Sequence, residues 1–198
     1  MPADFEKQSY WHDRFASETA FEWLAPSATF VSFLEPYLSV SGDQRILNLG
    51  SGTSDLHVHL REKGSEDVTN VDYEPLALGR GREIEKRLCG DVRTKYAVAD
   101  VTRLRADLPA PSAFDLVLDK STVDAVSCGG EAAFLAMARG VRQCLAPGGL
   151  WISLSYSAAR FDLEELPFDV HVIGKVPTPK AKVTDPDVYY WCYLLRPR

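Results

Sequence analysis

A glycine turn and an acidic residue further along the chain are the first features that could bind a ligand. Gly50 and Gly52 flank Ser51 in a tight turn that follows the apolar run 45–49. Glycine adopts backbone angles that other residues disfavour, and it lets a ligand approach the main chain closely. Asp72 ends a second apolar run about twenty residues further on, where a carboxylate can accept both hydroxyls of a ribose. The two features together predict a nucleoside site.

The same turn lacks the features that bind phosphates. A dinucleotide loop carries Gly or Ala at the sixth position of GxGxxG, whereas this chain has Asp55 there, and its carboxylate would repel a pyrophosphate. The sequence also contains no GxxxxGK(S/T) motif for a nucleoside triphosphate. A nucleoside without phosphates, such as S-adenosylmethionine, removes the conflict. Asp100, which ends a third run, could then accept the exocyclic amine proton of adenine. The alternative is that Asp100 caps a helix that begins after it.

An alternation of short apolar runs and helix-compatible segments must position these residues. We expect strands at 45–49, 67–72, 96–100, 114–119 and 150–155, and helices within 54–63, 75–89 and 130–145. This alternation predicts βαβ units and a mostly parallel sheet. Two β-rich runs, 169–176 and 188–195, flank a proline-rich loop and predict an antiparallel hairpin. The first forty residues read as helical pieces rich in aromatic side chains.

Composition narrows the classes of partner and the location. The chain has 198 residues and a net charge of −6, which argues against a protein that coats nucleic acid or an anionic membrane. No stretch approaches the ~20 apolar residues of a membrane span. The opening residues, with Asp4 and Glu6, are acidic, unlike a signal or transit peptide. The four cysteines form no CxxC pair, so we expect free thiols and a cytoplasmic protein.

Several segments in succession resemble one known family. These segments are 46–52, 71–73, 99–101, 114–120 and 145–149. Together they resemble the Rossmann-like, seven-β-strand (class I) S-adenosylmethionine-dependent methyltransferases. Residues 10–15, 21–23 and 119–125 resemble, more narrowly, the subgroup that includes the lysine methyltransferases of elongation factor 1-alpha and of citrate synthase. The likeness covers nearly the whole chain.

The resemblance implies a definite architecture. The expected fold is α/β, with a seven-stranded, mostly parallel sheet in the order 3-2-1-4-5-7-6, an antiparallel last strand, helices on both faces and an N-terminal helical cap. We expect one monomeric domain over 1–198. Its parts would be an N-terminal cap rich in aromatic residues at 1–43, cofactor-binding βα units at 44–156, and a C-terminal helix with a β-hairpin at 157–198.

The resemblance also implies which residues contact the cofactor. They are Trp11, Phe15, Trp23, Gly50, Gly52, Asp72, Tyr73, Asp100, Val101 and Lys120. An aromatic face attracts a sulfonium cation, although the three rings could instead merely pack the N-terminal helices onto the sheet. A second cation beside a sulfonium is unfavourable. We therefore expect Lys120 to act through its backbone or to reach the cofactor carboxylate; the alternative is an ion pair with Asp119 or Asp124.

The subgroup methylates proteins, which implies a protein substrate that presents a lysine and the conversion of S-adenosylmethionine to S-adenosylhomocysteine. We hypothesise that Asp119 and Asp124 guide the incoming amine. Two other functions stay open: methylation of a small-molecule amine, thiol or hydroxyl, and a non-catalytic cofactor-binding role. We expect no metal site, because His57 and His59 lie two residues apart and would point to different faces of a helix.

Overall fold

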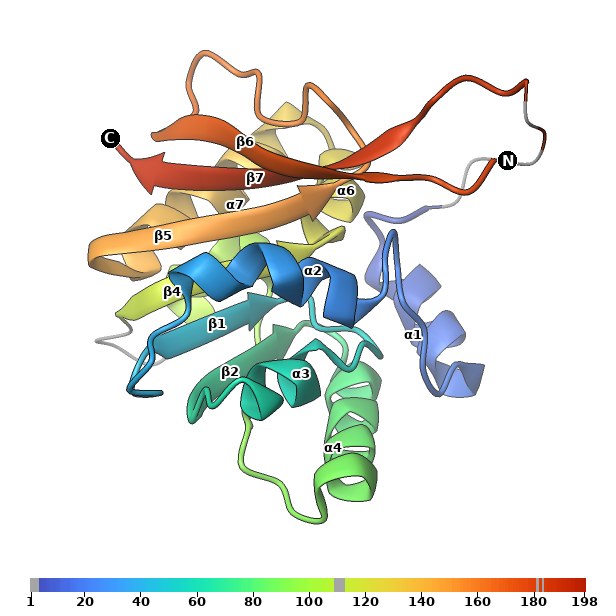
Figure 1. The fold of residues 1–198 in the computed structure, drawn as a ribbon, viewed down its shortest axis with the longest axis vertical. Coiled ribbons are helices and arrows are strands. Elements are labelled where there is room, and N and C mark those ends of the chain that lie inside the picture. The colour runs from blue at the N-terminus through green and yellow to red at the C-terminus, as the bar shows by residue number, and fades with distance from the viewer. Residues whose placement is uncertain (1–3, 109–112, 181, 183) are drawn as a thin grey trace.

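The computed structural model describes residues 4–108, 113–180, 182 and 184–198. Its centre is a seven-stranded sheet in the order β3-β2-β1-β4-β5-β7-β6 (Figure 1). The strands are β1 (Arg45–Leu49), β2 (Asp67–Asp72), β3 (Lys95–Val98), β4 (Phe114–Lys120), β5 (Leu145–Ser155), β6 (Phe168–Pro177) and β7 (Tyr189–Pro197). The first five strands pair in parallel, and β7 is antiparallel to both β5 and β6. The expected strand order and the antiparallel last strand are confirmed.

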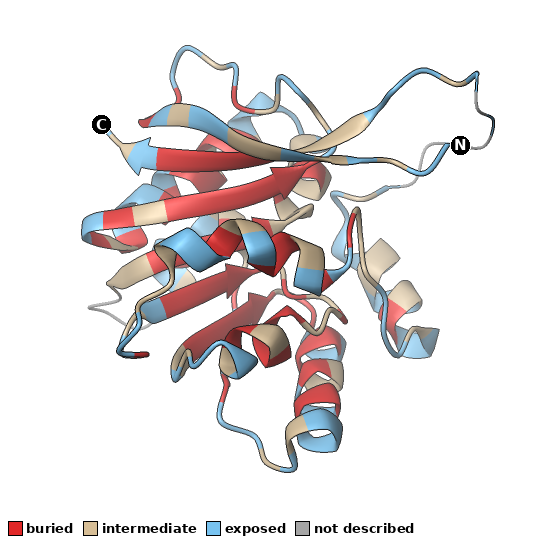
Figure 2. Cartoon of the chain, viewed as in Figure 1, coloured by how far each residue is buried: buried red, intermediate tan, exposed pale blue. Residues whose placement is uncertain are grey.

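Helices cover both faces of this sheet. They are α1 (Gln8–Ser17), α2 (Ser27–Leu34), α3 (Leu56–Glu62), α4 (Pro75–Cys89), α5 (Leu104–Asp107), α6 (Thr122–Ser127) and α7 (Glu131–Cys144), with 3-10 turns η1 (Glu35–Tyr37) and η2 (Val101–Arg103). Strands covered on both faces are apolar along nearly their whole length rather than at alternate positions. Four of the five residues in β1 are accordingly buried, and Figure 2 shows the central strands largely in the colour of buried residues.

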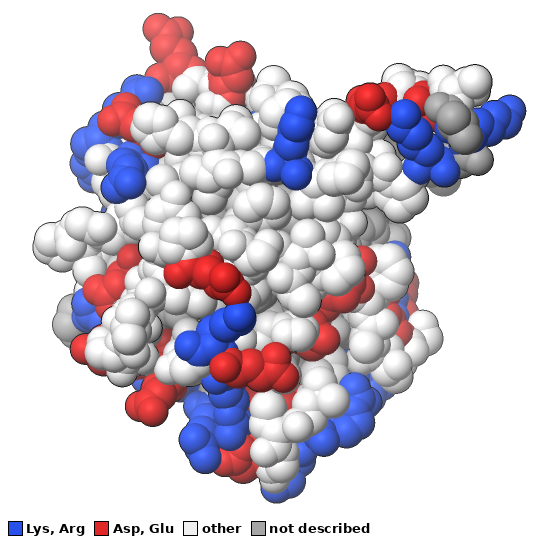
Figure 3. All heavy atoms as spheres, viewed as in Figure 1, with Lys and Arg blue, Asp and Glu red and all other residues white. Residues whose placement is uncertain are grey.

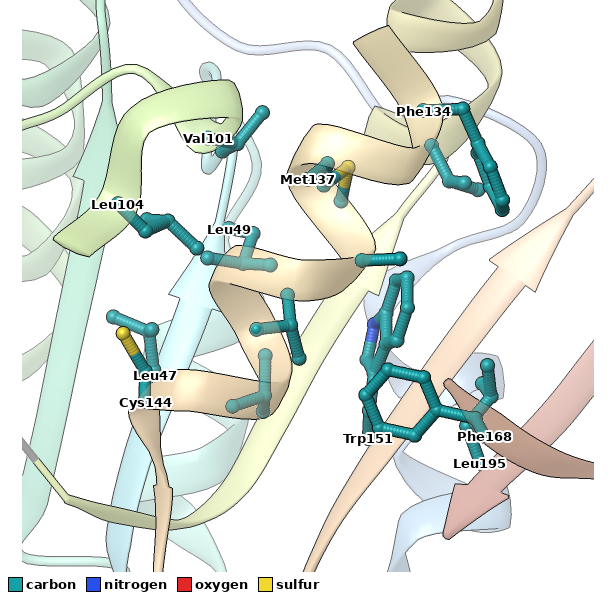
Figure 4. Packing of buried hydrophobic residues seen from close by; sticks show 14 of the residues in the cluster. Leu47, Leu49, Val101, Leu104, Phe134, Met137, Cys144, Trp151, Phe168 and Leu195 are labelled. Carbon is teal, nitrogen blue, oxygen red and sulfur yellow. The ribbon is translucent and has the colours of Figure 1, made fainter. Parts of the chain in front are cut away.

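The sheet separates two hydrophobic clusters. One lies between the sheet and α7 and includes Met137 and Phe134 of the helix and Trp151 of β5 (Figure 4). The other lies under α2 and α3 and includes Phe30, Leu34 and Leu60. Each large side chain that is fully buried contributes on the order of 1.5–3 kcal/mol. The sheet is therefore held rigidly from both sides, and so are the loops that leave it.

The C-terminal helix expected within 157–198 is wrong. The chain between β5 and β6 forms turns, in which the Asp162 N–H donates to Ala159 and the Leu166 N–H donates to Leu163. The segment buries Phe161 against the Trp151 ring, at a centroid distance of 5.3 Å. The next buried apolar residue, Leu166, follows after five positions, a spacing that does not place both side chains on one helix face.

All strands except β7 point the same way, so their carboxyl ends meet at one edge of the sheet, on the right in Figure 1. The β6–β7 hairpin extends beyond the same edge.

On the face seen in Figure 3, basic and acidic side chains are interspersed rather than gathered into a basic surface. Within the described residues, the structure contains no helix of the length and apolarity needed to cross a membrane.

Candidate functional site

A cavity of about 950 Å³ lies at the carboxyl edge of the sheet. Its wall takes one residue from the end of each successive strand: Asp100 after β3, Asp72 from β2, Gly50 after β1, Ser121 after β4 and Tyr156 after β5. Neighbouring strands lie ~4.8 Å apart, so the cavity extends along the sheet edge for several strand widths. Ligands of open α/β sheets bind at this position, beside the first strand.

The glycine turn forms the floor of the cavity. Gly50 has a φ of +55° and Gly52 a φ of +51°, both in the left-handed region that favours glycine. A Cβ at Gly50 would lie 2.4 Å from the hydroxyl oxygen of Thr122, which itself donates to the Leu49 carbonyl at 2.8 Å. The turn is therefore pressed against the start of α6, and a side chain at residue 50 does not fit.

Asp72 lies beside this turn with its carboxylate held by the backbone. One carboxylate oxygen accepts the Gly52 N–H at 2.9 Å and the other accepts the Glu74 N–H at 3.0 Å. The side chain lines the cavity but is only 4% exposed, and burial raises its pKa to about 6. Each oxygen has a second lone pair, so the carboxylate can still accept the two hydroxyls of a ribose.

Asp100 does what the alternative interpretation predicted. Its carboxylate accepts the Thr102 N–H at 2.8 Å and caps η2, while the side chain also lines the cavity. Val101 and Tyr73 line the cavity as well. Burial raises the pKa of the Tyr73 phenol, which therefore stays neutral at physiological pH. Asp72, Tyr73, Asp100 and Val101 follow or end the neighbouring strands β2 and β3, so this end of the cavity could hold an adenine ring next to Asp72.

An aromatic cap covers the cavity from the N-terminal side; we define it as Phe5, Trp11, Phe15 and Trp23. Its rings pack on one another, with centroid distances of 5.5 Å for Trp11–Phe15 and 5.8 Å for Trp11–Trp23. All four rings also line the cavity. The two interpretations of these aromatic residues, packing and ligand contact, are therefore compatible. Phe5 was not predicted from the sequence, and its only signal is its closeness to the aromatic residues of α1.

Lys120 has a partner that the sequence did not reveal. Its ammonium nitrogen lies 2.6 Å from a carboxylate oxygen of Glu22 and donates to the Trp23 carbonyl at 2.9 Å. It pairs with neither Asp119 nor Asp124, against the alternative considered above. Burial lowers the pKa of Lys120, and the ion pair with Glu22 opposes that shift. Glu22 belongs to the 21–23 motif, but nothing in the sequence indicated that it would meet β4.

The structure places Asp119 away from the cavity. The side chain is fully buried, where one oxygen accepts the Val123 N–H at 3.0 Å and the other accepts the indole N–H of Trp151 at 2.9 Å. Burial raises the pKa of Asp119 to about 7. The expectation that Asp119 guides an acceptor needs correction, because its carboxylate joins β4, α6 and β5 within the core and does not line the cavity.

Asp124 does line the cavity, and its carboxylate is already engaged. It accepts the Tyr156 N–H at 3.1 Å and pairs with Arg160, whose Nε lies at 3.0 Å. The Arg160 guanidinium in turn lies 5.1 Å from the ring centroid of Tyr156, a residue that is 58% exposed and lines the cavity. Asp124 is therefore positioned to hold Tyr156. Neither residue was predicted: Tyr156 directly follows β5 at the end of the expected βα units, and Arg160 lies in the segment that was expected to contain a helix.

Three further polar side chains have structural roles. The Asn48 amide donates to the Asn70 side chain at 3.0 Å in the cavity floor. His57 is fully buried, and its Nε2 lies 3.1 Å from the Gly81 carbonyl oxygen. His59, also on α3, lies near the carboxylates of Asp55 and Glu62. Among the residues that the structure describes, no group of three or more His, Cys, Asp or Glu could hold a metal ion.

The charges around the cavity favour a cation. The positive charges of Lys120 and Arg160 are each compensated by a carboxylate, those of Glu22 and Asp124 respectively. Asp72 and Glu6 line the cavity in addition, as does Asp100, whose carboxylate lies 3.4 Å from the Arg103 guanidinium. A cavity bordered by surplus negative charge attracts a positively charged ligand.

No family model matches the chain, but known proteins do. It is 58% identical over 202 residues to methyltransferase srdJ of Neurospora crassa, covering all of this chain and 86% of that protein. It is 31% identical over 170 residues to EEF1A lysine methyltransferase 4 of Mus musculus, covering 79% of this chain and 64% of that protein. The chain is also 27% identical over 197 residues to the eEF1A lysine and N-terminal methyltransferase homolog of Drosophila melanogaster. This match covers 92% of this chain and 28% of that protein.

Solved structures share the fold at low sequence identity. The N-methyltransferase NodS of Bradyrhizobium japonicum, in complex with S-adenosylhomocysteine, has a TM-score of 0.68 at 14% identity over 95% of this chain and 99% of that one. TrmN of Thermus thermophilus has a TM-score of 0.69 at 18% identity over 94% of this chain and 53% of that one.

Proposed function

Since the chain belongs to the seven-β-strand (class I) S-adenosylmethionine-dependent methyltransferases, we propose that its cavity binds S-adenosylmethionine and exposes the methyl group to a lysine amine of a protein. The observation that carries this proposal is the Asp72 carboxylate, held by the Gly52 N–H beside a glycine turn at the carboxyl edge of the sheet. The lysine acceptor is suggested by the relatives of 31% and 27% identity, which are both named as lysine methyltransferases of the protein eEF1A.

The residues of the cavity fit this cofactor. Asp72 would accept the ribose hydroxyls, Val101 and Tyr73 would flank the adenine, and Gly50 leaves room for the chain that joins ribose to sulfur. When bound, S-adenosylmethionine supplies an electrophilic methyl group on a positively charged sulfur. Trp11 and Trp23 present aromatic faces, which attract such a cation.

The chain's own contribution to catalysis would be alignment and exclusion of water. Methyl transfer needs little acid–base machinery, and holding two reactants in line can supply most of the acceleration. The aromatic cap keeps water away from one side of the cavity. A lysine ammonium, with a reference pKa of ~10.4, must lose its proton before it attacks. Tyr156, held by Arg160, borders the part of the cavity over β5 where the acceptor would enter.

The four free cysteines suit a reducing compartment such as the cytosol.

A small-molecule acceptor is the second candidate, and the volume of the cavity favours it. Small-ligand sites measure ~300–1,000 Å³. At about 950 Å³, this cavity is at the upper end of that range and could hold the cofactor together with a compact amine, thiol or phenol.

Labelling with cofactor that carries a tritiated methyl group separates these functions. The purified protein is incubated with this cofactor and a cell lysate, and radioactivity is followed in protein bands and in the small-molecule fraction. We expect a labelled protein band that loses its label when the lysine side chains are blocked beforehand. Label in small molecules alone would favour the second candidate. If the wild-type protein transferred no more label than an Asp72→Asn variant, both candidate functions would be overturned.

A further inference from the structure

Glu22 and Lys120 form an ion pair within the wall of the cavity. The two charged groups lie 2.6 Å apart, and the side chains are 27% and 5% exposed. Lys120 ends β4, whereas Glu22 belongs to the loop between α1 and α2, so the contact joins the sheet to the segment that bears the aromatic cap. Both residues line the cavity.

Further contacts fix this pair in place. The second carboxylate oxygen of Glu22 accepts the Asp55 N–H at 3.0 Å, and the first also accepts the Ser27 hydroxyl at 2.9 Å. Lys120 donates to the Trp23 carbonyl. Groups from the start of α2, the start of α3 and the end of β4 therefore hold the carboxylate against the ammonium. A network with this many partners is rigid.

The pair matters because the proposed cofactor and its product differ in charge. S-adenosylmethionine carries a sulfonium, whereas S-adenosylhomocysteine is a neutral thioether of nearly the same shape. An ammonium in the cavity wall whose charge is not compensated would repel the first and not the second. For two unit charges on the order of 12 Å apart, at an effective dielectric constant of ~20, this repulsion corresponds to about a tenfold loss of affinity.

We propose that Glu22 is a specificity-determining residue, an inference that rests on the proposed function. By compensating the charge of Lys120, Glu22 allows the cavity to accept the cationic cofactor in preference to the neutral product. Lys120 is then a positioning residue that holds Trp23 through its carbonyl, and Glu22 removes the electrostatic cost of placing an ammonium beside a sulfonium. This role differs from the direct contact with the cofactor that the family resemblance implied for Lys120.

The test compares the dissociation constants of S-adenosylmethionine and S-adenosylhomocysteine by calorimetry at pH 7. Glu22→Gln keeps the size of the side chain and an oxygen for the Asp55 N–H but removes the compensating charge. We expect the ratio of the two constants, cofactor over product, to rise about tenfold in this variant. The double variant Glu22→Gln/Lys120→Met lacks both charges and should return the ratio to that of the wild-type protein.

Glu18→Gln is the matched control. Glu18 lies four residues earlier in the same segment, where it accepts the Thr53 hydroxyl at 2.7 Å and pairs with Arg14, and it does not line the cavity. Its replacement should leave the ratio unchanged. Equal changes of both constants in Glu22→Gln, or a double variant that keeps the altered ratio, would overturn the inference. If the wild-type protein bound neither ligand, the proposed function itself would fail.

Discussion

The Asp72 carboxylate accepts the backbone N–H of Gly52 at 2.9 Å, and this hydrogen bond joins the end of β2 to the turn that follows β1. The two strands pair in parallel up to Leu49 and Val71, so the acid and the glycine turn reach the edge of the sheet together. The carboxylate is thereby fixed before a ligand arrives, which reduces the entropy lost on binding.

Asp72→Asn tests this contact. The amide keeps the size of the side chain but loses the charge and one acceptor, and hydrogen bonds to charged groups contribute roughly 1.5–3 kcal/mol. We expect S-adenosylmethionine to bind about 10- to 100-fold more weakly in a calorimetric titration. The control is Asp67→Asn at the opposite end of β2, where the side chain pairs with Lys95 at the surface. Equal losses in both variants would contradict the assignment.

The affinity for the cofactor should depend on pH through the same carboxylate. Burial raises the pKa of Asp72 to about 6, so the group becomes protonated as the pH is lowered through that value. The deprotonated carboxylate of Asp72 accepts hydrogen bonds from ribose hydroxyls and attracts a sulfonium, so cofactor binding favours that form. We therefore expect the affinity to be full above about pH 7 and to decline below pH 6. Calorimetry across this range should show the decline in the wild-type protein, and a similar decline in Asp72→Asn would assign it to another group.

Gly50→Ala should damage the turn. The new Cβ would meet Thr122 at 2.4 Å, and the residue would have to keep a φ of +55°. Together these effects should cost about 2–4 kcal/mol of unfolding free energy in urea denaturation. Gly79→Ala is the matched control, because Gly79 lies within α4 and a Cβ there would meet nothing within 4 Å. That variant should gain roughly 0.5–1 kcal/mol. Equal stability of the two variants would refute the steric argument.

Asp119→Ala should lower stability rather than affect an acceptor. It would leave the Val123 N–H and the Trp151 indole N–H buried without acceptors, at a cost of about 2–4 kcal/mol. Asp115→Ala, at the other end of β4, removes a half-exposed pair with Arg45 and the acceptor of the exposed Arg45 N–H, and it should cost less than about 1 kcal/mol. Urea denaturation of both variants decides the question. A stable Asp119→Ala protein with a raised KM for its acceptor would restore the guiding role.

Asp124→Asn should slow methyl transfer while the affinity for the cofactor stays unchanged. The variant breaks the ion pair with Arg160, which costs about 2–4 kcal/mol of unfolding free energy, and it releases Tyr156 at the acceptor side of the cavity. Labelling rates with the cell lysate and calorimetry with the cofactor measure the two effects separately. The exposed Asp162→Asn on the following turn serves as control. A parallel loss of cofactor affinity would place Asp124 in the cofactor site instead.

The sequence predicted the features that depend on short stretches of chain. The turn at Gly50 and the strand that ends in Asp72 are local patterns, and the parallel arrangement follows from the alternation of strands and helices. The same local logic fails for Asp119. Asp119 ends the expected strand 114–119 in the way that Asp72 ends β2, but the ring of Trp151, thirty-two residues later, covers it.

The contacts between distant segments could not be predicted. Glu22 and Lys120 meet only because the aromatic cap folds across the end of β4, and no periodicity in the sequence specifies that contact. A helix was expected in the segment that holds Arg160, and no motif singled out Tyr156 at the end of β5, so both residues were missed. The part of the cavity beside β1 and β2 was thus accessible to sequence reasoning, whereas the part over β5 was not.

The most direct test of the methyltransferase assignment is a crystal structure of the protein grown with saturating S-adenosylhomocysteine. We predict density for the ligand in the cavity at the carboxyl edge of the sheet, with its ribose hydroxyls within hydrogen-bond distance of the Asp72 carboxylate. A cavity filled by side chains of the protein, or ligand density that lies away from Asp72, would contradict the account.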